Sequence, residues 1–331
     1  MYEGHSIAAV IPAYNEESFI GEVIETLPDF VDRAYVVDDA STDDTWTEIQ
    51  THAERVNDAK PAESPVTDGG VELDPRVVPI QHDENRGVGG AIKTGYRAAL
   101  DDGVDVTLVV SGDGQTEPDI LERILEPVAA GEAGYAKGNR LLDQDRDAMP
   151  RFRQAGNFVL TFLTKISSGY WGMMDPQNGS TAISREALEA VDIAEMYEDY
   201  GYCNDLLARL NAAGVTVADV SRRAVYEDEE SHIDYRTYIP KVSVLLLGNF
   251  LWRLRSKYLS EQFHPLPLFY YAGAVAAGGG LASLLRRAAS SESDGVVESL
   301  TLVSVGVLGL IAGMVLDREE NRGMTVQKYD Q

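Results

Sequence analysis

The segment Val109 to Pro118 reads VVSGDGQTEP, and in it a short apolar run stops abruptly at Ser111. Two earlier segments follow the same pattern. IAAVIPAYNEE (Ile7 to Glu17) and AYVVDDASTDD (Ala34 to Asp44) each pass from Val- and Ile-rich sequence directly into a polar, mostly acidic cluster. Short apolar runs bounded by polar residues are typical of buried strands. Three such runs that end in carboxylates predict one shared site.

The apolar periodicity around these runs predicts strands that alternate with helices. We expect strands at residues 7–11, 34–37, 77–81 and 104–110, helices between them that end near residues 27, 55 and 100, and a surface insertion at 57–75. The polar residues at 41–44 can cap the second helix, and for Asp43 and Asp44 capping alone is an alternative role. Strand and helix alternation at this short spacing predicts a parallel, doubly wound α/β sheet.

In such sheets ligands bind beyond the carboxyl ends of the strands. We therefore expect Pro12 to Glu16, Asp38 to Asp43, Asn85 to Lys93 and Ser111 to Gln115 to lie along one rim. Carboxylates gathered there repel one another, and a divalent cation or a ligand with hydrogen-bond donors relieves that repulsion. Oxygen ligands without His or Cys nearby suit Mg²⁺ or Mn²⁺, which typically bridges carboxylates to a diphosphate. The residues alone predict a metal-dependent enzyme that uses a nucleoside diphosphate compound.

Composition excludes several other classes. The chain has 331 residues, 54 of them acidic and 28 basic, and a formal net charge of -26, so it should repel nucleic acid. Acidic residues spread along the whole length, with few Lys, are expected of a salt-adapted cytoplasm. The single cysteine, Cys203, excludes an internal disulfide framework. The glycines of GVGGA lack the GxGxxG spacing of a dinucleotide-binding dehydrogenase.

The last third of the chain predicts a membrane hairpin. Leu266 to Leu285 and Leu300 to Leu316 carry no charged residue, and each is near the length of about 17 to 25 residues that an apolar helix needs to cross a bilayer. Basic residues before the first and after the second favour cytoplasmic ends, although Arg286 and Arg287 in the connection argue weakly the other way. A pair of buried helices is the alternative. No signal peptide is visible, so we expect the amino-terminal half in the cytoplasm.

Between the predicted sheet and hairpin, Tyr235 to Tyr258 is aromatic and apolar with interspersed Arg and Lys. Positive charge concentrated there, in an otherwise acidic protein, fits a helix that lies on an anionic membrane face. A core helix is the alternative interpretation.

The motifs PAYNEE, VVDDASTDDT, NRGVGGA and SGDGQTEP, in this order and spacing, resemble those of the inverting family-two glycosyltransferases of GT-A fold. Within that family the chain is most similar to dolichyl-phosphate mannose or glucose synthases and their archaeal relatives, and the likeness continues through YAKGNRL, DPQNGSTAIS and FLWRLRSKYLSEQFHPLPLFY. The resemblance implies a GT-A domain of mixed, mostly parallel sheet at residues 1–230, an amphipathic juxtamembrane segment at 231–264, and a transmembrane hairpin with a short cytoplasmic tail at 265–331.

The resemblance also implies an activity, transfer of a sugar from a UDP- or GDP-linked donor to dolichyl or another polyprenyl phosphate, with Mg²⁺ or Mn²⁺ as cofactor. It implies a multi-pass protein of the cell membrane with its catalytic domain on the cytoplasmic face, serving protein N-glycosylation or related surface glycans. Site residues follow by matching motifs. The catalytic set is Asp113, Arg140 and Asp175; the nucleotide-binding set is Pro12, Ala13, Tyr14, Glu16, Asp38, Asp39, Lys93 and Asp113; the acceptor or phosphate set is Arg140, Arg151, Arg153 and Gln177; the metal ligands are Asp113 and Gln115.

Ser111 departs from the family pattern, since many relatives carry the first acid of a DxD motif at this position. Losing that carboxylate leaves Asp113 as the surest metal ligand and predicts either weaker metal dependence or a water molecule in place of the missing acid. Arg140, Arg151 and Arg153 fit a phosphate because a guanidinium fork binds phosphate bidentately, although ordinary surface arginines are an alternative.

The acceptor stays open between two kinds. A lipid phosphate is already anionic near neutral pH, its second pKa being about 6, and needs no general base. A hydroxyl of a lipid-linked glycan would need a carboxylate such as Asp175 or Asp205 to accept its proton. A processive polysaccharide synthase would need more crossings and a QxxRW motif, which this sequence lacks. Different classes remain as alternatives: a membrane-tethered binding protein with a decayed transferase domain, or a nucleotidyltransferase, which has no use for a hairpin.

Overall fold

The computed structural model describes residues 1–59, 66, 72–113, 118–139, 151–221, 235–260, 264–290 and 294–328. Two predicted site residues, Gln115 and Arg140, lie outside these ranges, as does most of the predicted insertion. Arg151 and Arg153 are described as backbone only.

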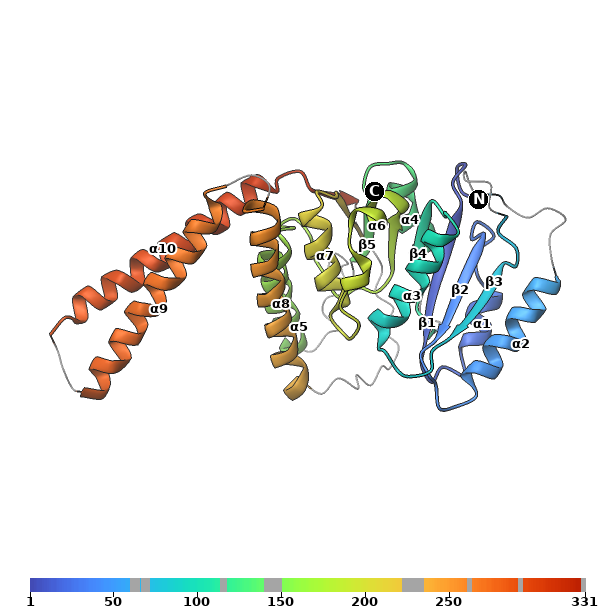
Figure 1. The fold of residues 1–331 in the computed structure, drawn as a ribbon, viewed down its shortest axis with the longest axis horizontal. Coiled ribbons are helices and arrows are strands. Elements are labelled where there is room, and N and C mark those ends of the chain that lie inside the picture. Colours follow the sequence, from blue (N-terminus) through green and yellow to red (C-terminus); the bar gives the residue numbers. More distant parts are fainter. Residues whose placement is uncertain are drawn as a thin grey trace.

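One mixed sheet of eight strands organises the described chain, in the order β3-β2-β1-β4-β6-β5-β7-β8 (Figure 1). Only β6 among them runs antiparallel, to its neighbours β4 and β5; the other described pairs are parallel. The predicted doubly wound sheet is therefore confirmed, and the strands expected near residues 7, 34, 77 and 104 are its first four. The strands are β1 (Ile7–Ala13), β2 (Arg33–Asp38), β3 (Val77–Gln81), β4 (Val106–Val109), β5 (Tyr135–Asn139), β6 (Thr181–Ser184), β7 (Val217–Ser221) and β8 (Thr325–Lys328).

Helices cover both faces of the sheet, because strands of a parallel sheet are apolar on both sides. One face packs on α1 (Ile20–Glu25), α2 (Thr45–Asp58) and α4 (Pro118–Ala129). The other packs on α3 (Val88–Asp101), α6 (Arg185–Ala190) and α7 (Tyr202–Ala212), with the short 3-10 helix η2 (Ile193–Glu195) beside them. We call residues 1–221 together with β8 the sheet domain.

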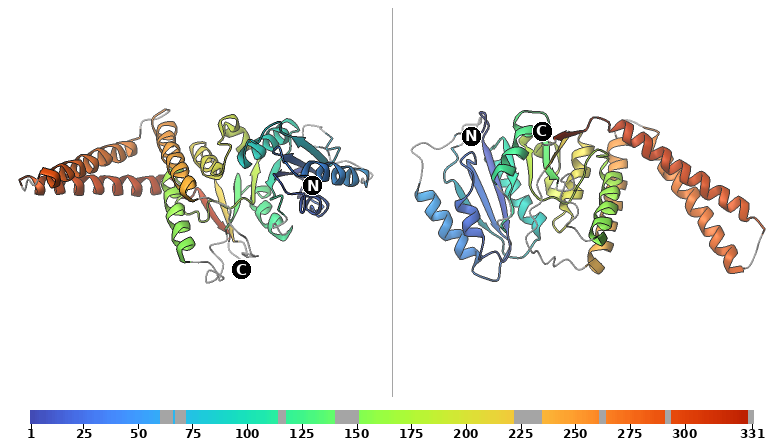
Figure 2. Two further views of the ribbon diagram at one scale, coloured as in Figure 1. Left: turned by 90° about the horizontal axis from the view of Figure 1, so that it is seen from below. Right: turned by 180° about the vertical axis from the view of Figure 1, so that it is seen from behind.

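Four longer helices lie beyond one end of the sheet. Helices α5 (Arg151–Ser168) and α8 (Tyr235–Tyr258) pack side by side at that end of the sheet, and α9 (Leu266–Ser290) and α10 (Val296–Glu320) project away from it as an antiparallel hairpin (Figure 2). Within the hairpin the backbones approach closely at glycines: a Cβ added to Gly306 would lie 2.2 Å from the amide nitrogen of Ala277. Small residues allow such close packing of membrane helices.

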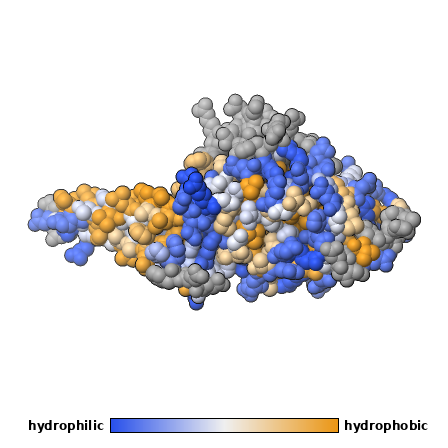
Figure 3. Space-filling model, turned by 90° about the horizontal axis from the view of Figure 1, so that it is seen from above, coloured by the Kyte–Doolittle hydropathy of each residue, from blue (hydrophilic) through white to orange (hydrophobic). Residues whose placement is uncertain are grey.

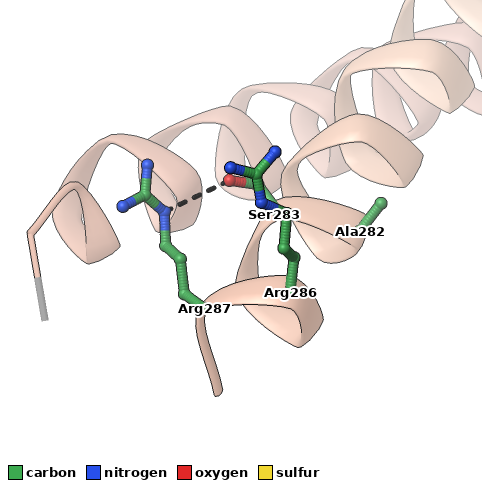
Figure 4. Close-up of a pocket in the computed structure, with 4 residues that line it drawn as sticks. All are labelled: Ala282, Ser283, Arg286 and Arg287. Carbon is green, nitrogen blue, oxygen red and sulfur yellow. Dashed lines mark hydrogen bonds between the residues drawn. The ribbon is translucent and has the colours of Figure 1, made fainter. Parts of the chain in front are cut away.

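Both hairpin helices are long and apolar enough to cross a membrane. Only 17% of the most apolar window of each is buried, whereas the core helix of a soluble protein would be mostly covered. At the tip of the hairpin, far from the sheet, a small hollow is lined by Ala282, Ser283, Arg286 and Arg287, and Arg287 donates a hydrogen bond to the Ser283 hydroxyl at 3.3 Å (Figure 4). The structure therefore confirms the predicted pair of apolar helices, and most of their apolar surface is not covered by the rest of the described chain.

The chain returns to the sheet after the hairpin. Strand β8 pairs in parallel with β7, with Val217 opposite Thr325 and Val220 opposite Lys328. From the sequence, only a short tail is expected at this place. Because β8 belongs to the sheet, the last residue of α10, like the first residue of α9, lies at the end of the hairpin that is next to the sheet domain.

Helix α8 has the predicted bounds, but its basic residues are not arranged as expected. Arg253 is fully buried in an ion pair with Asp317 of α10, and Lys257 donates hydrogen bonds to Asn211 and Asn321. These two cations therefore face the protein and not a membrane surface, which corrects the interpretation of their charge. Apolar side chains such as Val244 and Leu247 are the exposed ones.

Candidate active site

The loops after β1 and β4 are in direct contact at the carboxyl edge of the sheet. Val110 donates its backbone N–H to the carbonyl of Val10 at 3.0 Å, which carries the pairing of these strands to their ends. Gly112 then lies so close to the carbonyl oxygen of Pro12 that an added Cβ would be 2.8 Å from it. Glycine at this position therefore brings Asp113 beside the PAYNEE loop, as the sequence predicted.

Hydrogen bonds interlock the loops after β1 and β2. Asn15, in the left-handed region with φ of 57°, donates its N–H to the Ser41 hydroxyl at 2.9 Å and accepts from the Thr42 N–H at 2.9 Å. The Glu16 N–H donates to the Thr45 hydroxyl at 2.7 Å. These contacts fix the direction in which Tyr14 and Glu16 leave the strand, and Tyr14 is half exposed at the rim.

Three carboxylates converge where these loops meet. Partial burial, followed by the nearby charges of Asp113 and Asp43, raises the pKa of Glu16. Although desolvation opposes it, hydrogen bonds from Thr45 lower the pKa of Asp43, so this group stays ionised. The resulting negative potential favours a cation or a ligand rich in hydrogen-bond donors. The predicted single rim is confirmed for these loops.

The donor set fits a hard divalent cation that is held by few protein ligands. Oxygen groups alone converge here, as Mg²⁺ and Mn²⁺ prefer. Among the described residues, no group of three or more His, Cys, Asp or Glu side chains is placed to enclose a metal ion. Asp113, the first predicted metal ligand, lies in the described part of the chain, and Gln115, the second, lies outside it.

Asp38 and Asp39, predicted to bind nucleotide, also organise the loops around them. Asp39 is buried and accepts hydrogen bonds from His82 Nδ1 at 2.7 Å, from the Arg86 N–H at 2.9 Å and from the Gly87 N–H at 2.7 Å. Asp38, fully buried, accepts from the Gln81 side chain at 3.0 Å. His82 was missed by the sequence analysis, since its partner lies 43 residues earlier in the chain and no motif links them.

Lys93 lies beneath the rim in an ion pair. Its ammonium group donates to Glu198 at 2.7 Å and to the Met196 carbonyl at 3.3 Å. Hydrogen bonding from Lys93, with Arg86 contributing, lowers the pKa of Glu198. The glycines before Lys93 serve this packing, because a Cβ on Gly89 would lie 2.5 Å from the Tyr197 carbonyl oxygen. Glu198 was not predicted, since nothing in its local sequence distinguishes it.

The DPQNG loop carries Asp175 and Gln177 to the other half of the sheet. The Met174 N–H donates to Asp219 of β7 at 2.9 Å, and Lys137 and Asn139 of β5 hold the same carboxylate at 2.8 Å and 2.7 Å. Asp175 is buried and has a φ of 44°, in the left-handed region. The structure therefore anchors this loop at the carboxyl ends of β5 and β7.

Gln177 joins three elements. Its amide donates to Asn204 of α7 at 3.0 Å, and its oxygen accepts from the Tyr238 hydroxyl of α8 at 3.3 Å. The loop is thus tied both to the sheet and to the helix that leads to the hairpin. Asp219 and Asn204, which support this loop, were not among the predicted site residues.

The comparisons agree with this geometry. The fold is similar to that of glucosyl-3-phosphoglycerate synthase from Mycobacterium tuberculosis, with a TM-score of 0.50, 21% identity, and coverage of 76% of this chain and 79% of that one in the structure that contains Mn²⁺ and UDP-glucose. This likeness places the sheet domain in the GT-A fold class of glycosyltransferases.

The sequence carries the assignment one step further. The model of glycosyl transferase family 2 matches residues 8–192, and the chain belongs to that family. It is 29% identical over 224 residues to a UDP-N-acetylglucosamine–dolichyl-phosphate N-acetylglucosaminyltransferase of Methanococcus voltae, covering 67% of this chain and 86% of that protein. It is 28% identical over 218 residues to an undecaprenyl-phosphate mannosyltransferase of Micrococcus luteus, covering 65% of this chain and 81% of that one. The protein is a glycosyltransferase, as the sequence motifs predicted.

Proposed function

We propose that this glycosyltransferase moves a sugar, with inversion, from a UDP- or GDP-linked donor to dolichyl or another polyprenyl phosphate at the cytoplasmic face of the cell membrane. The observation that carries the proposal is an acidic rim on a sheet whose last strand follows a membrane-length hairpin. The names of the M. voltae and M. luteus relatives, which specify lipid phosphate acceptors, support the same acceptor class.

The interlocked loops after β1, β2 and β4 form the donor site in this proposal. Pro12, Tyr14 and Glu16 contact the nucleoside, and Asp39 holds the 82–87 loop and contacts base or ribose. Asp113 and Gln115 would hold Mg²⁺ or Mn²⁺, which when bound supplies positive charge against the departing diphosphate. The M. tuberculosis enzyme of the same fold class is described with Mn²⁺ and UDP-glucose.

The reaction then depends on positioning. An oxygen of the acceptor phosphate forms a bond to the anomeric carbon while the bond from that carbon to the donor diphosphate breaks, and the electron pair leaves with the nucleoside diphosphate. The acceptor oxygen is anionic near neutral pH, so no general base has to remove a proton. Arg140, Arg151 and Arg153 are the proposed phosphate ligands, and the DPQNG loop with Asp175 and Gln177 borders the sugar.

The membrane lies along the hairpin and along the outer sides of α5 and α8 in this proposal. Exposed apolar side chains continue from the hairpin onto these two helices: Phe158, Val159, Phe162 and Leu163 on α5, and Val244, Leu247, Leu251 and Trp252 on α8. Apolar residues gather over the hairpin while hydrophilic ones dominate the sheet domain (Figure 3). Both hairpin ends then face the cytoplasm, where nucleotide sugars are available.

The test uses the full-length protein in vesicles that contain polyprenyl phosphate, supplied with a panel of UDP- and GDP-sugars. We expect one donor to give a lipid-linked sugar phosphate, and Asp113→Ala to lower its rate of formation by about 100-fold or more, because a carboxylate proposed to hold the metal is lost. Asp101→Ala, an exposed carboxylate at the end of α3, is the matched control and should retain activity. Transfer only to a lipid-linked glycan, or to no lipid at all, would contradict the proposal.

A further inference from the structure

A buried polar cluster joins the hairpin to the sheet domain. The guanidinium of Arg253 on α8 donates to both carboxylate oxygens of Asp317 on α10, at 2.9 Å and 2.8 Å. Both side chains are completely inaccessible to solvent. We call Arg253, Asp317 and the groups bonded directly to them the junction.

The same guanidinium also holds the sheet domain. Arg253 donates to the carbonyls of Ser167 at 2.9 Å and Ile166 at 3.0 Å, which are unpaired acceptors at the carboxyl end of α5. Gly169, with φ of 80°, follows this end, and a Cβ there would lie 2.6 Å from Arg253 Nη1. The Arg253 side chain therefore links its own helix, α8, to α5 and α10, and the missing side chain of Gly169 leaves room for the guanidinium.

Asp317 is bonded from the sheet domain as well. Trp171, in the loop between α5 and β6, donates its indole N–H to Asp317 at 3.2 Å, and the Tyr258 hydroxyl donates at 2.9 Å. Asn321, one turn further along α10, donates to the same carboxylate at 3.0 Å. Every oxygen of the carboxylate is thus engaged by groups of fixed direction.

The apolar packing around the junction is small. Leu254, Tyr258, Leu266 and Tyr270 form the buried cluster between α8 and the hairpin among the described residues, with Phe250, Leu310 and Met314 against it. Apolar contacts of this extent would allow the hairpin to slide and rotate against α8. The Arg253 guanidinium has five N–H donors of fixed direction, so its hydrogen bonds allow only one relative position of the helices. The hairpin is therefore held at a set angle by the polar contacts.

We propose that the junction is a positioning element, which holds the carboxyl rim of the sheet at a fixed height and tilt over the membrane in which the hairpin sits. This inference rests on the proposed function in one respect, since the group to be reached is a phosphate at the bilayer surface. Neither Arg253 nor Asp317 contacts the rim itself. Their effect on transfer is exerted through the orientation of the sheet domain.

The first test measures orientation without reference to activity. Spin labels on Ser290→Cys at the hairpin tip and Glu189→Cys on α6 report one distance in vesicles, and native Cys203 is buried and does not interfere. We expect a narrow distance distribution in the parent protein and a clearly broader one in Arg253→Met/Asp317→Leu, which removes the ion pair without leaving an isolated buried charge. Equal widths in both proteins would overturn the inference, whatever the enzyme transfers.

The second test separates positioning from general damage. The double variant should lose at least 10-fold in kcat/KM with a long polyprenyl phosphate embedded in vesicles. It should stay within about 2-fold of the parent with a short-chain prenyl phosphate that dissolves in water, because that acceptor reaches the rim at any tilt. The KM for the donor should not change. Equal losses with both acceptors would assign the junction to stability alone and contradict a positioning role.

Two further variants control the result. Arg185→Met/Asp105→Leu removes an ion pair of the sheet domain far from the hairpin and should not distinguish the two acceptors. Arg253→Lys keeps the charge but loses the fork, and it should lie between the parent and the double variant in both tests. If the parent protein transfers to neither acceptor, the proposed function fails, while the distance measurement still decides the role of the junction.

Discussion

Lys257 lies beside the junction, and its surroundings disfavour its charged form. It donates to the carbonyl of Asn211 at 3.0 Å and to Asn321 at 2.7 Å, but no carboxylate among the described residues pairs with it directly. Burial first, and then the charge of Arg253, lowers the pKa of Lys257 to about 8. Its ammonium group therefore releases a proton far more readily than a lysine in the unfolded chain, whose pKa is about 10.4.

The sign of the pH effect follows from this shift. Between pH 8 and about 10.4 the unfolded chain binds more protons than the folded protein, so Lys257 makes folding more favourable as the pH rises through this window. We expect the difference in Tm between the parent and Lys257→Met to move in favour of the parent, by a few degrees, from pH 7.5 to pH 10. Thermal melts of both proteins across this range provide the measurement, and a difference independent of pH would contradict it.

Glu16 is expected to lower the stability of the ligand-free protein while it contributes to ligand binding. Because Asp113 and Asp43 repel its carboxylate, Glu16→Gln should stabilise the ligand-free protein by about 0.5 to 1 kcal/mol, the size of an interaction between partly exposed charges. The same change should reduce the rise in Tm caused by UDP with Mn²⁺. Melts with and without ligand measure both effects. Glu17→Gln, an exposed neighbour, is the control, and a ligand-free protein that becomes less stable would exclude the repulsion.

Single residues were predictable where a motif fixes their place. Asp113 and Glu16 follow strands whose ends must meet, so their proximity could be inferred from the chain order. The position of Arg253 could not be predicted in this way. The sequence shows a basic residue in an apolar helix, but not whether its side chain faces the protein or the surface until its partner is known. Its partner, Asp317, lies 64 residues later, directly after the second apolar segment, and no motif links the two residues.

At the scale of elements, the strands and helices of the first 110 residues follow from periodicity alone. Strand β8 does not. Thr325–Lys328 has four residues and little alternation, and what makes it a strand is the free edge of β7, which only the folded sheet provides. The hairpin helices were predictable because each contains a charge-free apolar stretch near the length that crosses a bilayer, but their attachment to α8 was not.

The attachment changes what a truncation should do. Ending the chain after Glu261 removes β8 and the hairpin, and with them Asp317, so Arg253 keeps its hydrogen bonds to the α5 carbonyls but loses its ionic partner. We expect this truncated protein to be released from membranes but to aggregate. Adding Arg253→Met should raise its soluble yield and its Tm.

Arg255→Met in the same truncated protein is the matched control, because Arg255 is exposed on α8. Yield after centrifugation and thermal melts compare the three proteins. An equal gain from both substitutions would show that the charge of Arg253 is not what destabilises the truncated form.

At the scale of the whole molecule, the proposed membrane arrangement places the Leu266 end of α9 and the Glu320 end of α10 on the cytoplasmic side, and the Ser290 end of α9 on the opposite side. We expect Ser290→Cys to react with an impermeant maleimide applied outside intact cells, and Glu319→Cys to react only after permeabilisation. Burial raises the pKa of the Cys203 thiol to about 11, so the native cysteine should remain unlabelled. Labelling of both positions from one side would show that α9 and α10 do not cross.

The return of the chain to the sheet has a consequence for biosynthesis. Residues 325–328 leave the ribosome after both hairpin helices, yet they cover the edge of β7, which until then presents unpaired backbone groups. In the proposed arrangement, a chain whose hairpin crosses the bilayer only once leaves β8 on the opposite side of the membrane from that edge. Completion of the sheet thus excludes a single crossing, and a protein that has crossed only once keeps an open strand edge that proteases and chaperones can recognise.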